Sequence, residues 1–155
     1  MTPTTLHPTA DKNLDAACAT VAGEIGRTDG KASLLLAFDG ALLAGLASVA
    51  DKNLPTATKA FGALAVLALG TAAALLLLVV RPRLRGDDRA SFPHWARLTD
   101  DEIRACMDGD NRVAHVRVLS ALAVAKFTGL RHAVDLSLTA LVLLTLAAAA
   151  LALAG

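Results

Sequence analysis

Cationic side chains beside long apolar stretches are the residues of this sequence best suited to bind a ligand. Lys126 is the clearest case, because Leu119 and Leu122 are its neighbours along one stripe of the helix predicted there. Its ammonium group could bind an anion together with a cation from the N-terminal segment. Alternatively, its aliphatic stem covers apolar surface while the ammonium group reaches the lipid headgroups. The residues themselves leave both interpretations open.

Asp39 is the second candidate, because it is the one charged residue of the apolar stretch 32–50. With a rise of about 1.5 Å per helical residue, it lies roughly 10 Å beyond the start of that stretch. An ionised carboxylate at such a depth costs at least about 2.5 kcal/mol, so it should face other helices or a water-filled path. Ser137 and Thr139 are the nearest donors predicted at similar depth. Asp39 is therefore either a hydrogen-bonded or protonated interior group, or part of a pore or gate.

The patterns typical of enzymes and metal sites are missing from the sequence. It contains no GxSxG, no HExxH, no phosphate-binding glycine loop and no dinucleotide fingerprint, and its two cysteines form no CxxC. His94 and His115 lie among arginines rather than beside a nucleophile and a carboxylate. Fifteen basic against fourteen acidic residues give a net charge of +1, which argues against a nucleic-acid partner. We expect no enzymatic activity, no metal and no cofactor.

Composition and its distribution predict how these residues are positioned. Apolar residues make up 55% of the chain and charged residues 19%, against about 45–50% and about 25% in soluble domains. The apolar residues form three blocks, 32–50, 60–80 and 133–154, each close to the 20 or so residues that a helix needs to cross a bilayer. The sequence therefore predicts an all-α integral membrane bundle with three transmembrane helices.

The basic residues predict the orientation of these spans. The run RPRLR at 81–85 directly follows the second block, and basic residues beside a span are retained in the cytoplasm. We expect a multi-pass protein of the cell inner (plasma) membrane with an external C-terminus. The other predicted segments are a cytoplasmic N-terminal segment at 1–31, an external loop at 51–59 and a cytoplasmic helical insert at 81–132.

Local signals divide the two cytoplasmic segments further. Apolar residues at three- and four-residue spacing from Leu14 to Ile25 predict a short amphipathic helix. Prolines and a glycine predict irregular structure over 81–96, and Thr99 followed by Glu102 forms a capping box that starts a short helix, 100–107. A turn is predicted over 108–111. From Arg112 there is no proline and one glycine, which predicts a single helix to about Leu153.

The sequence resembles the Pycsar effector family of small bacterial membrane proteins over about residues 25–154. The resemblance rests on Arg27-x-Asp29-x-Lys31-Ala32 before an LLL…GALLAGL span, on a second span ending in Arg81-Pro82, and on Leu119-Ser120, Ala125-Lys126-Phe127 and Leu130-Arg131-x-Ala133 before the last span.

The resemblance implies a role in bacterial antiphage defence. A partner cyclase would make a cyclic pyrimidine mononucleotide, cCMP or cUMP, and the effector, a homo-oligomer in the lipid bilayer, would respond by disrupting the inner membrane. Related sequences are often named integral membrane plasmid transfer proteins, so the alternative is a structural or adaptor membrane protein linked to plasmid transfer. A transporter is disfavoured, because three spans provide no inverted repeat.

A nucleotide would need an unusual site in this chain. Residues 81–132 provide neither the strands nor the glycine-rich loop of a cyclic-nucleotide-binding β-roll. Any such ligand would bind at helix ends near the membrane surface, with Trp95 as the side chain that stacks on its base. The candidate phosphate-binding residues are Arg27, Lys31, Lys126 and Arg131.

Overall fold

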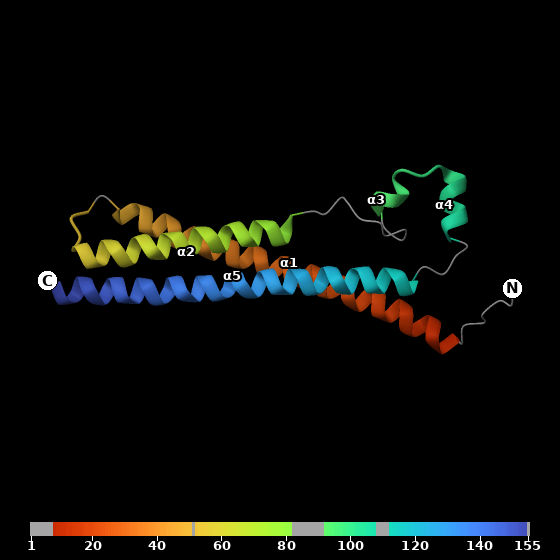
Figure 1. Cartoon of the computed structure of the whole chain (residues 1–155), viewed down its shortest axis with the longest axis horizontal. Helices are drawn as coiled ribbons and strands as arrows, with labels where there is room; N and C mark the ends of the chain where they lie inside the picture. The colour runs from red at the N-terminus through yellow and green to blue at the C-terminus, as the bar shows by residue number, and fades with distance from the viewer. Residues whose placement is uncertain (1–7, 51, 82–91, 108–111, 155) are drawn as a thin grey trace. The chain divides into compact units, whose positions relative to one another are not determined.

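The computed structural model describes residues 8–50, 52–81, 92–107 and 112–154, and every regular element among them is a helix (Figure 1). The predicted all-α fold is therefore confirmed. The helices are α1 (Pro8–Val49), α2 (Thr56–Val80), α3 (Phe92–Trp95), α4 (Asp100–Met107) and α5 (Arg112–Ala154).

Three helices are long and apolar enough to cross a membrane. They are α1, α2 and α5, judged by length and composition, and they contain the predicted blocks 32–50, 60–80 and 133–154 almost in full. The single long helix predicted from Arg112 is also confirmed, since α5 continues without interruption to Ala154.

Two local predictions differ from the structure. The N-terminal amphipathic helix is not separate but continues into the first span as α1, because no proline follows Pro8 to end it. Part of the stretch predicted to be irregular, Phe92–Trp95, forms the single turn α3, and Pro93 fits there because the first turn of a helix needs no proline N–H. Residues 82–91 and the turn predicted over 108–111 lie outside the described residues.

The Thr99–Glu102 pair predicted to start α4 is in place, with one of the two reciprocal bonds of a capping box. The backbone N–H of Thr99 donates to Glu102 Oε2 at 2.8 Å, and the Thr99 hydroxyl donates to the same oxygen at 2.9 Å. These bonds stabilise the ionised carboxylate and so hold the pKa of Glu102 below its ordinary value. The bond from the backbone N–H has the larger effect of the two. The pair fixes where α4 begins and satisfies a donor that the helix itself leaves unpaired.

The chain divides into two units, each of which is described by itself. The insert unit comprises residues 1–27 and 82–125, and the membrane unit comprises residues 28–81 and 126–155. Within the insert unit, the guanidinium of Arg112 at the start of α5 donates to Asp15 Oδ1 of α1 at 3.1 Å. This ion pair joins the two helices near the ends that lie in the insert unit.

The core of the membrane unit is narrow and built on small residues. Buried residues of α2 recur at alternating four- and three-residue spacing, which places them on one stripe facing α1 and α5. Alanines from each helix sit in the contact, among them Ala32, Ala65 and Ala133, all fully buried. Such small side chains let helices approach closely in a bilayer. Leu69 and Leu76 are the large apolar side chains buried there, but many others point outward, with Leu67 67% and Leu34 75% exposed, as expected of surfaces that face lipid.

Gly129 of α5 lies against Val79 of α2, and it provides a test of this packing. A Cβ atom added there would lie 2.6 Å from Val79 Cγ2. Gly129→Leu should force the helices apart and lower the free energy of unfolding by about 1–3 kcal/mol, as overpacking does. Gly70→Leu is the matched control, because a Cβ on that α2 glycine meets nothing within 4 Å. Equal unfolding midpoints for the two variants in detergent would contradict the close contact.

Candidate functional site

An ion pair joins the two sequence segments that flank the first and third spans. Lys126 Nζ of α5 donates to both carboxylate oxygens of Asp29 of α1, at 2.5 Å to Oδ1 and 2.8 Å to Oδ2. The Lys126 side chain is only 12% exposed and that of Asp29 is 35% exposed. The ammonium group of Lys126 is therefore held by an anion of this chain, an arrangement that neither sequence-based interpretation of this lysine included.

The pair lies on the packed faces of both helices. Ala32 is one turn beyond Asp29 on α1 and is fully buried, and Gly129 is one turn beyond Lys126 on α5, against Val79 of α2. Water therefore reaches this pair less than it reaches the exposed pair between Arg104 and Asp101. Removing one partner would leave the other charge partly buried and unpaired, which is far more destabilising than losing a surface pair.

Within the described part of the membrane unit, no hydrogen bond or ion pair joins Lys126 to the other predicted phosphate-binding residues of that unit. Lys31 and Arg131 belong to the membrane unit, where both are exposed. Arg27 belongs to the insert unit, where its guanidinium donates to Glu24 Oε1 at 2.8 Å. Trp95 lies in α3 of the insert unit and is half-buried. Of the four cations, Lys126 alone contacts an acid on another helix in the described residues.

Asp39 forms the polar centre of the membrane unit. It is fully buried on α1, and the hydroxyl of Ser137 on α5 lies 3.0 Å from its Oδ2. One of the two predicted donors is thus confirmed. The other, Thr139, donates to the carbonyl of Asp135 in its own helix at 2.8 Å. In this structure Asp39 is an interior hydrogen-bonded group.

The hydrogen-bond count at Asp39 favours the neutral acid. Ser137 Oγ lies 3.0 Å from Asp39 Oδ2 and 3.1 Å from the Ala133 carbonyl oxygen, but a serine hydroxyl has a single hydrogen. If Asp39 carries a proton on Oδ2, it can donate to Ser137 while Ser137 donates to Ala133. The ionised form would have to share one hydrogen between two acceptors. Its Oδ1 is also buried without a hydrogen-bond partner, which penalises a charge further.

The Asp29 partner was the one site residue that sequence reasoning did not assign. Asp29 was part of the motif before the first span, and Lys126 was part of the motif before the third. Their opposite charges at one predicted membrane boundary were the available signal. Which faces of the two helices meet could not be read from that signal, because packing residues further along each helix decide it.

Comparison with known proteins identifies the family of the chain. A family model described as the Pycsar effector protein domain matches residues 13–154. The match includes α1 from residue 13 onward, all of α2 and α5, and every residue of the membrane-unit sites described above. No curated protein and no solved structure matches the chain. The match confirms the resemblance drawn from the two motifs, and the family's role is that of an effector in antiphage cyclic-nucleotide signalling. The chain belongs to the Pycsar effector family of membrane proteins.

Proposed function

We propose that the protein disrupts the integrity of the inner membrane when a cyclic pyrimidine mononucleotide, cCMP or cUMP, binds to it. The observation that carries the proposal is the family match over residues 13–154, because it spans nearly the whole chain. A partner cyclase supplies the nucleotide in the cytosol. The N-terminal segment and residues 81–132 would therefore face the cytoplasm, with the C-terminus external and several copies associating in the bilayer.

The Asp29–Lys126 ion pair supplies a resting state for this mechanism. A cyclic mononucleotide carries one negative charge on its phosphodiester, which is the charge that Asp29 already offers to Lys126. The phosphate would replace the carboxylate on the ammonium group, with the exposed cations Lys31 and Arg131 as further candidate partners. Asp29 would then be left partly buried and unpaired. The ion pair that joins α1 to α5 at Asp29 and Lys126 would be lost.

Opening of the bundle would change the surroundings of Asp39. In the closed unit this carboxyl group is buried against Ser137. Separation of α1 from α5 would admit water, and an ionised Asp39 from each copy would then line a hydrated path. The closed and open states thus differ in the protonation and hydration of one residue.

Growth of cells that express the protein tests this proposal. Expression alone should be tolerated, whereas cCMP or cUMP supplied by a co-expressed cyclase should stop growth and admit a membrane-impermeant DNA dye. A cyclase variant that makes no nucleotide is the control. If growth is unimpaired and the dye is excluded both with cCMP and with cUMP, the result contradicts the proposal and favours the structural or adaptor role.

A further inference from the structure

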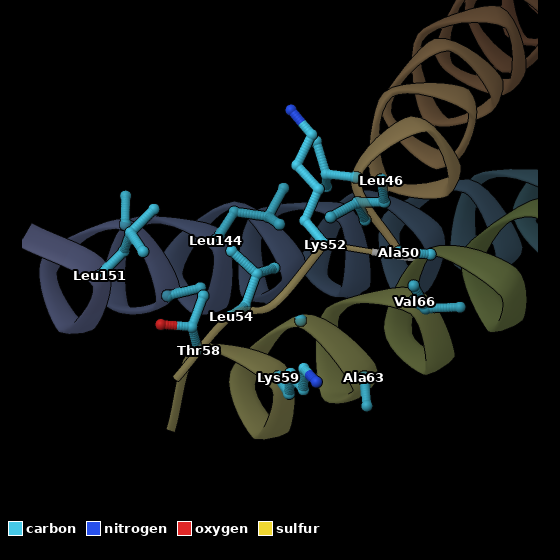
Figure 2. A pocket seen from close by; sticks show the side chains of 14 residues that line it. Leu46, Ala50, Lys52, Leu54, Thr58, Lys59, Ala63, Val66, Leu144 and Leu151 are labelled. Carbon is cyan, nitrogen blue, oxygen red and sulfur yellow. The ribbon is translucent and has the colours of Figure 1, made fainter. Parts of the chain in front are cut away.

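A cleft opens in the membrane unit where α1 ends and α2 begins. It has a volume of about 540 Å³, within the range of roughly 300–1,000 Å³ typical of ligand pockets. Figure 2 shows Leu46 of α1, Val66 of α2, and Leu144 and Leu151 of α5 around it. Three helices thus contribute apolar side chains, so the body of the cleft suits a hydrocarbon chain.

Polar side chains also line the same cleft. Lys52 and Lys59 are among its lining residues, and both are exposed. Thr58 also lines it, is only 8% exposed, and has a buried hydroxyl oxygen without a hydrogen-bond partner. A buried hydroxyl without a partner is unfavourable unless a ligand supplies one. Among the described residues of the membrane unit, Asp39 Oδ1 is the other buried side-chain oxygen without a partner.

The start of α2 adds to this positive character. Its first turn contains no acidic residue, and Pro55 at the N-cap position makes no side-chain hydrogen bond to the helix. The N–H groups of that turn therefore lack a side-chain cap, and they carry the partial positive charge of the helix dipole. The segment 51–59 has two lysines and one aspartate, so its charges add to this potential.

We propose that this cleft binds an anionic phospholipid, with its phosphate at Lys52, Lys59 and the Thr58 hydroxyl and one acyl chain among the apolar side chains. The cleft lies at the ends of the long apolar helices, the level at which headgroups meet a bilayer protein. A symmetric contact with a second copy of the chain is less favourable, because the described residues that line the cleft include two lysines and no acidic side chain to pair with them. The inference does not depend on the nucleotide response.

Filling the cleft tests its occupancy. Gly62 lines the cleft, and a Cβ there meets nothing within 4 Å, so Gly62→Leu should place a side chain in the acyl site without straining α2. Native mass spectrometry in micelles of phosphatidylglycerol and phosphatidylcholine should show retained phosphatidylglycerol on the unmodified protein and about tenfold less on Gly62→Leu. Gly70→Leu, on the same helix but outside the cleft, should retain as much as the unmodified protein. Equal retention by both leucine variants would overturn the proposal.

The headgroup contacts are tested separately. Each lysine beside an anionic lipid contributes on the order of a fivefold change in binding, so Lys52→Ala with Lys59→Ala should weaken phosphatidylglycerol binding at least about tenfold and leave phosphatidylcholine unchanged. Lys12→Ala, an exposed lysine of the insert unit, is the control. Three results would contradict the proposal: an equal loss of both lipids, displacement of the lipid by inorganic phosphate, or a change from oligomer to monomer in Gly62→Leu with lipid binding intact.

Discussion

Asp29→Asn is expected to lower the nucleotide concentration needed for half of the maximal response by at least about tenfold. The amide keeps the size of the side chain but removes the charge that competes for Lys126 Nζ, with which Asp29 makes two hydrogen bonds. A charge-assisted hydrogen bond of this kind contributes about 1.5–3 kcal/mol, which corresponds to at least about tenfold in an equilibrium constant. Dye entry measured against cCMP or cUMP concentration gives the shift. Asp101→Asn, which breaks an exposed ion pair of α4, should leave the curve unchanged.

Variants of Lys126 separate an inhibitory contact from simple packing. Lys126→Ala should remove the response to the nucleotide and still insert into the membrane. Exchange of the two residues, Asp29→Lys with Lys126→Asp, restores an ion pair between α1 and α5 but moves the cation to the other helix. The exchanged protein should be as stable as the unmodified one and should not respond. A normal response from Lys126→Ala would show that the Asp29–Lys126 pair is structural and does not bind the nucleotide.

Asp39→Leu is expected to silence the effector while making the closed bundle more stable. The buried carboxyl group is replaced by an apolar side chain, and Ser137 keeps its bond to the Ala133 carbonyl. The change should raise the free energy of unfolding by about 1–3 kcal/mol, because it removes a buried carboxyl oxygen that lacks a hydrogen-bond partner. Asp39→Asn can still bond with Ser137 but cannot ionise, so expression should persist and ion leakage after activation should fall.

The control for Asp39 is another carboxylate of the same unit. Asp135 is exposed on α5, so Asp135→Asn should change neither stability nor leakage. Ion flux through the activated protein in vesicles separates the cases. If both Asp39 variants leak as the unmodified protein does, Asp39 serves only in packing.

The sequence predicted the features that depend on distance along a helix. The three long helices follow from block length, the start of α4 from Thr99 and Glu102, and the uninterrupted α5 from the lack of proline after Arg112. Ser137 was predicted beside Asp39 because both were counted from the same membrane boundary, at about 1.5 Å per residue.

Features that depend on rotation about a helix axis could not be predicted in this way. Asp29 contacts Lys126 because Ala32 and Gly129 let α1, α2 and α5 approach on those particular faces. In a chain so rich in alanine, no single face stands out in the sequence as the packed one. The cleft was missed for a related reason, since it arises from how three helix ends and residues 52–54 meet.

Release of a trapped dye from vesicles tests whether the protein alone makes a bilayer permeable when the nucleotide binds. The purified full-length protein is reconstituted into liposomes that enclose a self-quenching fluorophore, and cCMP, cUMP or a linear mononucleotide is added outside. We expect rapid dye release with one of the two cyclic pyrimidine nucleotides and none with the linear one. Lys126→Ala and Asp39→Leu should each abolish the release. The protein must be inserted in both orientations, so that some copies face the added nucleotide with their cytoplasmic side. If these vesicles keep their dye at every concentration of both cyclic nucleotides, the proposed function is wrong.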